Sequence, residues 1–306
     1  MADQVKTISK KKTGTGEGPH WDEKTQCLYF TNIPGCTINK YDSKTGLHTQ
    51  AKLSEYTSTS IIIPIKNEPN KFLVTSGCTL ATITWDGVSE SVSDFKTLLT
   101  LDNDPNMMTN DGKVSPSGVL VIGTLARDLD INDLEKRKGH LYSFKNMKAE
   151  RLRGEILITN GIAWSSDEET LYFVDSGTCK VYSYQYDKET TEISNEKTVF
   201  DFKENNVEGF PDGMASDRDG NLWVACYGGS QVINIDPREG KLLRAIALPS
   251  RNITSVAFGG PNFEDLYVTS GSMSWPSSDQ TREEDGYTFV ITKTGARGFP
   301  ATAFEL

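Results

Sequence analysis

The sequence predicts an all-β protein, a six-bladed β-propeller whose four-stranded blades surround a central channel, built as a single domain over residues 1–306. Three observations support this prediction. A short phrase of an oxygen-bearing residue, a glycine, a turn and an apolar strand recurs along the chain. Its copies are spaced like propeller blades. No long amphipathic helical pattern interrupts the strands.

The repeated phrase is clearest around Asp212-Gly213. These residues precede a short strand, a turn at Asp219-Gly220-Asn221 and an apolar strand over 222–226, which is the pattern of a β-hairpin. Three more copies begin at Glu17-Gly18, Asp111-Gly112 and Asn160-Gly161. One copy could be an ordinary turn. Four copies in the same phase predict a repeat whose first residues meet at a common point.

The spacing of the copies gives the number of blades. Two weaker copies, at Ser60 and Ser255, extend the series, and successive members lie about 43 to 52 residues apart. Because a four-stranded propeller blade takes about 40–50 residues, six copies predict six blades. The full series is Glu17, Ser60, Asp111, Asn160, Asp212 and Ser255.

Both ends of the chain are expected to close the ring. A propeller leaves no long free strand edge, so the N-terminal strand over 5–8 should pair with the final blade. The last strands, near 287–291 and 303–306, should complete that closure. Two polar segments, 127–139 and 271–286, are expected to be loops, and a short lid beside the site is the alternative for 127–139.

Composition and charge exclude several classes of function. The formal net charge is −10, so nucleic acid is not an expected partner, whereas a small molecule or a metal ion fits. The N-terminus lacks an apolar signal core, and no apolar run approaches membrane-spanning length. The five cysteines are odd in number and scattered, as expected for reduced thiols in a cytoplasmic protein. We expect a monomer that acts on a small-molecule substrate.

Three familiar functional motifs are absent or out of context. Gly14, Gly16 and Gly18 imitate a phosphate-binding loop, but no helical pattern follows them. The three histidines form no zinc-binding motif. No Gly-x-Ser-x-Gly sequence indicates a serine hydrolase. The chemistry is therefore expected at the repeated phrase.

Equivalent positions on the innermost strands of a propeller converge on its channel. Glu17, Asn160 and Asp212 would there offer two carboxylates and an amide carbonyl. Such hard oxygen ligands suit one divalent ion, Ca²⁺, Mg²⁺ or Mn²⁺, with Zn²⁺ as a further option. Three protein ligands leave positions for water and substrate, and Asp212 could be ligand and general base together. The alternative is that the acid–glycine pairs are only turn signals of the fold.

The same residues resemble a known family, that of regucalcin (senescence marker protein), gluconolactonase and luciferin-regenerating enzyme. The matching segments are Gly16-Glu17-Gly18-Pro19-His20-Trp21, Asn110-Asp111-Gly112-Lys113, Asn160-Gly161, Pro211-Asp212-Gly213, Leu222-Trp223-Val224-Ala225 and Phe258-Gly259-Gly260. Segments 84–89 and 266–270 look closest to the insect luciferin-regenerating branch. The resemblance covers nearly the whole chain and implies a six-bladed propeller with one divalent ion in its channel.

The resemblance also implies roles for particular residues. Glu17, Asn160 and Asp212 match metal-ligand positions, and Asp212 matches the proton donor and acceptor of lactone hydrolysis. Asn110 matches a position near metal and substrate, whereas the repeat spacing alone selects its neighbour Asp111. We favour Asn110 and keep Asp111 as a neighbour in the substrate site.

Two departures from the family pattern concern substrate recognition. Lactonases of the family carry arginine two residues before the Asn of Asn-Asp-Gly, where this chain has Met108. Methionine cannot donate a hydrogen bond to a sugar lactone and offers an apolar wall instead. Asp128 matches a substrate-contacting acid of the regucalcins but is one methylene shorter. The predicted substrate is therefore a more apolar lactone, ester or heterocycle.

Together these observations predict a cytoplasmic, divalent-metal-dependent hydrolase of a lactone-like small molecule. In the luciferin-regenerating case, which the resemblance alone implies, the substrate would be oxyluciferin. Two alternatives remain open. One is a non-catalytic calcium-binding regulatory protein of the regucalcin type, and the other is a small-molecule carrier that has lost its metal.

Overall fold

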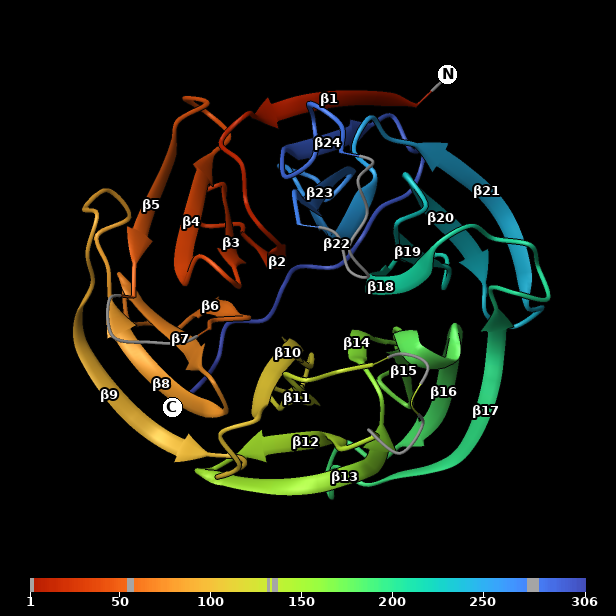
Figure 1. Ribbon diagram of the computed structural model, residues 1–306, viewed down its shortest axis with the longest axis horizontal. Helices are drawn as coiled ribbons and strands as arrows, with labels where there is room; N and C mark the ends of the chain where they lie inside the picture. Colours follow the sequence, from red (N-terminus) through yellow and green to blue (C-terminus); the bar gives the residue numbers. More distant parts are fainter. Residues whose placement is uncertain (1–2, 54–57, 131–132, 134–136, 274–280) are drawn as a thin grey trace.

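The computed structural model describes residues 3–53, 58–130, 133, 137–273 and 281–306. These residues form six four-stranded antiparallel sheets arranged in a ring (Figure 1), which confirms the predicted six-bladed propeller. In this described part of the chain the one helix is the single turn η2 (Ser176–Thr178). No helix found there has the length and apolar character needed to span a membrane.

The first three blades follow one another along the chain, each running from its inner to its outer strand. Blade 1 contains β2 (Gly16–Asp22), β3 (Cys27–Asn32), β4 (Thr37–Asp42) and β5 (His48–Lys52). Blade 2 contains β6 (Ile62–Pro64), β7 (Lys71–Ser76), β8 (Thr79–Thr84) and β9 (Ser93–Thr100). Blade 3 contains β10 (Met107–Val114), β11 (Leu120–Ala126), β12 (Gly139–Lys145) and β13 (Lys148–Ile156).

The next two blades repeat this order, and the last one borrows a strand from the N-terminus. Blade 4 contains β14 (Thr159–Trp164), β15 (Thr170–Asp175), β16 (Lys180–Tyr186) and β17 (Ile193–Asp201). Blade 5 contains β18 (Phe210–Ser216), β19 (Leu222–Tyr227), β20 (Gln231–Asp236) and β21 (Lys241–Ala247). Blade 6 contains β22 (Asn252–Gly259), β23 (Asp265–Gly271), β24 (Thr288–Thr292) and β1 (Gln4–Ser9).

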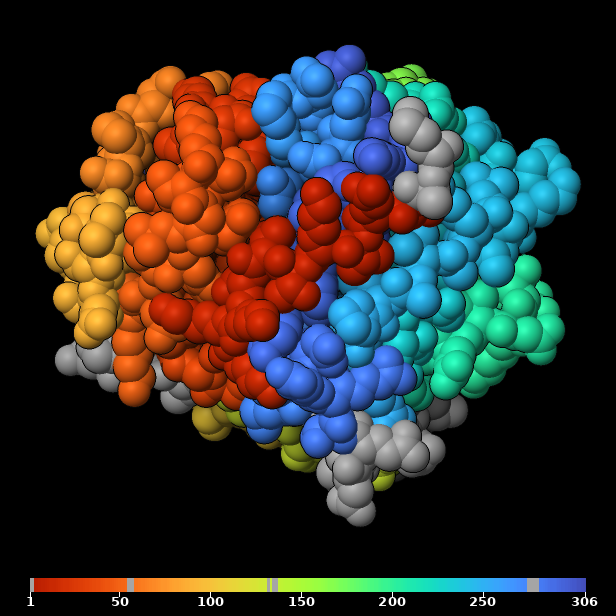
Figure 2. Space-filling view, turned by 90° about the horizontal axis from the view of Figure 1, so that it is seen from above, coloured from red at the N-terminus to blue at the C-terminus, as the bar shows by residue number. Residues whose placement is uncertain are grey.

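The ring closes through the N-terminal strand, as predicted. β1 pairs antiparallel with β24, with Val5 opposite Ile291, and so becomes the outer strand of blade 6. Figure 2 shows this red strand lying over the blue C-terminal blade on the outer wall. The N-terminal strand thereby supplies the edge strand that segment 252–292 lacks.

The expectation for residues 303–306 was wrong, because they do not complete the final blade. After β24 the chain crosses the end of the channel, from blade 5 to blade 2 (Figure 1). Arg218 N donates to Arg297 O (2.8 Å) at one side, and Phe304 N donates to Pro64 O (2.9 Å) at the other. Phe304 is buried and stacks on Phe144, with ring centroids 5.7 Å apart. We call residues 297–304 the crossing segment.

Five of the six innermost strands shift register at the repeated phrase. The breaks lie between Glu17 and His20, Thr109 and Gly112, Asn160 and Ile162, Pro211 and Met214, and Ile253 and Ser255. Such bulges re-aim side chains. A Cβ added at Gly161 would lie 2.6 Å from Asp212 O, so only glycine permits these strands to approach so closely. The acid–glycine pairs are therefore bulge sites that turn polar side chains to the channel.

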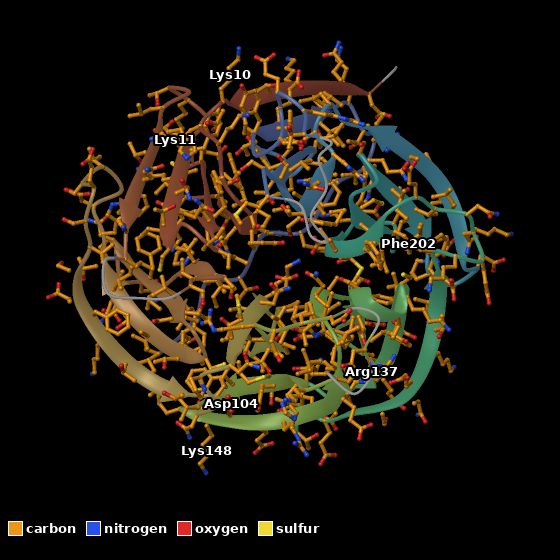
Figure 3. All side chains as sticks on the ribbon, in the orientation of Figure 1. Lys10, Lys11, Asp104, Arg137, Lys148 and Phe202 are labelled. Atoms are coloured by element: carbon orange, nitrogen blue, oxygen red, sulfur yellow. The ribbon has the colours of Figure 1, made fainter. Side chains whose placement is uncertain are left out.

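Apolar side chains fill the space between neighbouring blades, which keeps the ring rigid. Trp21 of blade 1 stacks on Tyr267 of blade 6, with ring centroids 4.7 Å apart. Tyr29 of blade 1 packs on Phe72 of blade 2, with ring centroids 5.0 Å apart. Charged side chains such as Lys10 and Lys148 lie exposed at the perimeter (Figure 3). The buried polar groups described next are consequently held in a well-packed frame.

Candidate functional site

A cavity of about 160 Å³ lies where the innermost strands begin. We call it the acidic cavity. Glu17 comes from β2, Asn110 from β10, Asn160 from β14 and Asp212 from β18, so four blades contribute. Its complete lining is Thr15, Glu17, Asn110, Leu125, Ile158, Asn160, Ser176, Phe210, Asp212 and Tyr227. The structure thus brings together the three residues predicted as metal ligands and one predicted substrate contact.

Two oxygen atoms in this cavity have no hydrogen-bond partner. Asn160 and Asp212 are 4% and 5% exposed, and the Oδ1 atom of each is buried and unpaired. A buried polar atom without a partner costs about 1–3 kcal/mol, so it is normally matched by a ligand or ion. Two such oxygens beside the Glu17 carboxylate fit a divalent cation. In the described part of the chain no three His, Cys, Asp or Glu side chains form a metal cluster by themselves, so the amide oxygen is an essential member of the set.

The Asn160 amide is held in one orientation by a short chain of hydrogen bonds. Asn160 Nδ2 donates to Ser176 Oγ (3.0 Å), and Ser176 Oγ donates to Pro211 O (2.6 Å). Because the amide nitrogen is occupied, Oδ1 is the atom left facing the cavity. Ser176 itself starts the turn η2, whose N-cap Asp175 accepts from Gly177 N (3.1 Å). Blade 4 therefore holds the Asn160 amide so that its oxygen, the candidate metal ligand, faces the cavity.

Burial and mutual repulsion perturb the carboxylates. Burial raises the pKa of Glu17 well above its ordinary value, and the charges of Asp212 and Asp111 raise it further. Burial and Asp111 likewise raise the pKa of Asp212 well above its ordinary value. Burial also raises the pKa of Asp111, while Lys113 opposes that rise. A cluster of acids that repel one another is stabilised by a bound cation, which is the electrostatic counterpart of the unpaired oxygens.

The other predicted site residues are more dispersed. Asn110 is half-buried, lines the acidic cavity and donates from Nδ2 to Thr159 O (2.8 Å). Met108 pairs across the sheet with Leu125, which lines the cavity, but Met108 itself does not. Asp128 contacts the side chain of Asn106 outside the cavity lining. The structure therefore gathers Asn110 into the cavity and leaves Met108 and Asp128 outside its walls.

Asp111, the residue that the repeat spacing selects, does not line the acidic cavity. It lines a second cavity, farther along the innermost strands, and its Oδ1 accepts from Gly112 N (2.8 Å). The register shift between Thr109 and Gly112 explains the difference, because a bulge changes which side chains face the same side. Asn110, which the family resemblance favoured, is the neighbour that reaches the acidic cavity.

Comparisons with known proteins show the family of this chain. Residues 15–272 match the model of the SMP-30/Gluconolactonase/LRE-like family. The chain belongs to this family. Regucalcin from Xenopus laevis is 34% identical over 308 residues, which cover 98% of each chain. The solved structure of a luciferin-regenerating enzyme is 35% identical, with a TM-score of 0.94 and full coverage of both chains. A calcium-binding protein, regucalcin, from Agrobacterium tumefaciens is 25% identical, with a TM-score of 0.85 and coverage of 99% and 98%.

Sequence reasoning missed several residues that line the acidic cavity. Ser176 lies 16 residues after Asn160 and outside the repeated phrase, so no local pattern connects the two. Leu125 lies on a second strand, and Ile158 lies before β14. Phe210 and Tyr227 face each other across the register of β18 and β19. Apolar alternation predicts these strands but does not say which of their side chains face the channel.

Proposed function

We propose that the protein is a divalent-metal-dependent hydrolase that acts on a lactone-like carbonyl of a small molecule in the acidic cavity. The observation that carries this proposal is the pair of buried, unpaired Oδ1 atoms of Asn160 and Asp212. With the Glu17 carboxylate they form a set of hard oxygen ligands that accepts Ca²⁺, Mg²⁺, Mn²⁺ or Zn²⁺. A bound ion would polarise the substrate carbonyl and lower the pKa of water.

The residues of the chain have separate tasks in this proposal. Asp212 takes the proton from the attacking water, because its carboxylate lies in the cavity and burial raises its pKa, which makes it a stronger base than an exposed carboxylate. Asn110 is held by its hydrogen bond to Thr159 O and positions the substrate. Asn160 keeps its oxygen turned to the cavity through Ser176. Glu17 and Asp212 supply the negative charge that retains the ion.

The cavity walls favour a substrate with an apolar part. Leu125, Ile158 and Phe210 line the cavity next to the polar set, and Tyr227 adds an aromatic face. Such surfaces gain from contact with a ring or an aliphatic chain rather than a sugar. A luciferin-regenerating activity on oxyluciferin is one special case, supported by the 35% identity to an enzyme of that name.

A calcium-binding regulatory role is the second candidate, because relatives are named regucalcin and calcium-binding protein. It needs the same ligand oxygens but no turnover. For both candidate functions we propose that the protein is a cytoplasmic monomer. The five cysteines are all free and buried, as suits a reducing compartment.

The test is a hydrolysis assay on lactones from gluconolactone to apolar ones, and on oxyluciferin, with each of the four ions in turn. Asp212→Asn is assayed beside the wild type, and Asp236→Asn, on β20 in blade 5, is the matched control. We expect metal-dependent turnover that falls at least about a hundredfold in Asp212→Asn alone. Tight metal binding without turnover would favour the regulatory candidate. Turnover unchanged in Asp212→Asn would reject the proposed site.

A further inference from the structure

A second and larger cavity lies at the other end of the channel. Its volume is about 320 Å³, within the range of small-molecule sites. We call it the lysine cavity, after Lys113 of β10. Phe299, Pro300 and Thr302 of the crossing segment form part of its wall. That segment is fixed on both sides of the ring by backbone hydrogen bonds at Arg218 and Phe304, so the cavity is a formed part of the fold.

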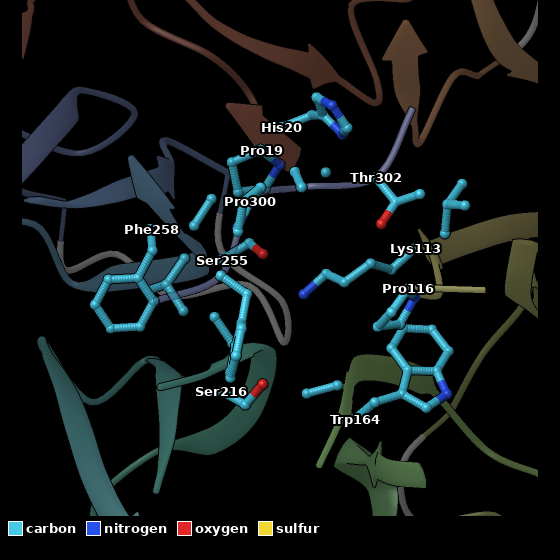
Figure 4. A pocket seen from close by; sticks show the side chains of 18 of the residues that line it. Pro19, His20, Lys113, Pro116, Trp164, Ser216, Ser255, Phe258, Pro300 and Thr302 are labelled. Carbon is cyan, nitrogen blue, oxygen red and sulfur yellow. The ribbon is translucent and has the colours of Figure 1, made fainter. Parts of the chain in front are cut away.

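The Lys113 ammonium is the cationic group of this cavity. Figure 4 shows the side chain extending into the middle of the space, towards Ser255 and Ser216. Its Nζ donates to Met214 O (2.5 Å), and among the described residues it has no carboxylate within ion-pair distance. An ammonium has three donors, so two are left to be matched inside the cavity. A half-buried cation of this kind calls for a charged or strongly polar acceptor.

The rest of the lining defines the shape and polarity of the ligand. Trp164, Phe258 and Phe299 give flat aromatic walls, and Ser216, Ser255 and Thr302 add hydroxyl groups. His20 also lines the cavity, and burial lowers its pKa to about 4, so it adds no positive charge at neutral pH.

Asp111 is the one acidic residue among the lining residues, and its placement leaves room for an anion. Its Oδ1 accepts from Gly112 N (2.8 Å), and it lies beyond ion-pair distance from Lys113. The two charges attract each other through space, because Lys113 opposes the rise in the Asp111 pKa, but they form no contact ion pair. An incoming carboxylate can meet Lys113, Ser216 and Ser255 while its apolar body rests on the aromatic side chains.

From this arrangement we propose that the lysine cavity is a second binding site, separate from the acidic cavity, for a small monocarboxylate with a flat apolar body. It does not depend on the proposed hydrolase function. The carboxylate pairs with the Lys113 ammonium, and the flat body packs between Trp164 and Phe258. A hydrogen bond to a charged group contributes enough binding free energy that loss of the Lys113 ammonium should raise the dissociation constant about tenfold or more.

The probe is benzoate, titrated by calorimetry into the full chain in a buffer with EDTA, so that no metal ion attracts the carboxylate. Benzyl alcohol, which has the same ring without the charge, is the matched ligand. We expect saturable benzoate binding that is at least about tenfold weaker in Lys113→Met and about tenfold weaker for benzyl alcohol. Binding should be unchanged in Asp212→Asn, which alters only the acidic cavity.

Ser216→Leu is the second variant, because it fills the cavity and leaves Lys113 in place. It should abolish binding even if Lys113→Met fails to fold. The proposal is overturned by any of three results. These are no saturable binding of benzoate, equal affinity for benzyl alcohol and benzoate, or binding that is lost in Asp212→Asn and retained in Ser216→Leu.

Discussion

The two cavities of the channel share their strands but differ in chemistry. β10 contributes Asn110 to the acidic cavity and Lys113 to the lysine cavity, and β18 contributes Asp212 to one and Ser216 to the other. In the first, the buried carboxylate of Asp212 and the buried amide of Asn160 each leave one oxygen unpaired. In the second, an ammonium lacks an ion pair. Three or four residues along one innermost strand are enough to reverse the charge that a ligand meets.

The difference arises from the bulges and from the crossing segment. The register shifts lie beside Glu17, Asn160 and Asp212, so they separate the residues that face one cavity from those that face the other. The crossing segment, residues 297–304, then covers only the end that holds Lys113. One ring of similar four-stranded blades can therefore form two cavities of unlike charge.

The sharpest way to separate the cavities is to remove one charge from each and measure metal affinity. Glu17→Gln should weaken divalent-ion binding at least about a hundredfold, because it removes an ionised ligand from a small set. Lys113→Met should not weaken it, because a nearby positive charge opposes cation binding. Calorimetric titration with Ca²⁺ and Mn²⁺ measures both. Equal losses in the two variants would show that the cavities act as one electrostatic unit.

The second prediction concerns the closure of the lysine cavity. Phe304 is 2% exposed and stacks on Phe144, so Phe304→Ala should lower the free energy of unfolding by about 3 kcal/mol. Leu306→Ala, at a 50% exposed position, is the control and should change it by less than about 0.5 kcal/mol. Urea unfolding measures both. A small loss in Phe304→Ala would mean that the crossing segment is not a structural part of the ring.

The innermost strands and residues 303–306 differ in how well the sequence predicted them. The innermost strands were predictable because a local phrase of acid, glycine, turn and apolar strand recurs at blade spacing, and the ligand oxygens lie inside that phrase. The path of 303–306 was not, since its partner Ile65 lies in blade 2, far away in sequence. In the sequence, an apolar residue near a terminus gives the same signal whether it belongs to a blade strand or to a segment that crosses the channel.

The lysine cavity was equally hidden. Lys113 is visible in the Asn-Asp-Gly-Lys motif, but its surroundings come from the five other blades and the crossing segment. Its neighbour Ser255 begins a weak copy of the repeated phrase, but nothing in that phrase shows that Ser255 and Lys113 line one cavity. Long-range contacts of this kind are set by closure of the ring, and local periodicity carries no information about them.

The third prediction uses pH to test the charge of the acidic cavity. The pKa values of Glu17 and Asp212 are raised by burial above their ordinary values of 4.5 and 3.8. The folded metal-free protein therefore keeps protons that the unfolded chain has released. Because of this difference, the free energy of unfolding falls as the pH rises from the ordinary pKa values towards the raised ones. A divalent ion takes the place of those protons.

Added Ca²⁺ should therefore raise the thermal midpoint more at about pH 7.5 than at about pH 5. At a hundredfold excess over the dissociation constant the stabilisation should reach about 2.7 kcal/mol. Differential scanning calorimetry at both pH values measures the effect, and Glu17→Gln should reduce it. A shift as large at the lower pH would contradict the assignment of the ion to these carboxylates.

The smallest effect should come from Ser176, which touches the predicted ion only through Asn160. Ser176→Ala removes the acceptor of Asn160 Nδ2 and the donor to Pro211 O, so the amide is free to turn and its Oδ1 is no longer fixed in the cavity. We expect divalent-ion affinity to fall about tenfold, as for other outer hydrogen bonds around a metal. Ser166→Ala, at the lysine cavity, should leave it unchanged. If Ser176→Ala binds the ion as tightly as wild type, Asn160 is held by the ion itself, and the oxygen set is more adaptable than the hydrogen-bond chain indicates.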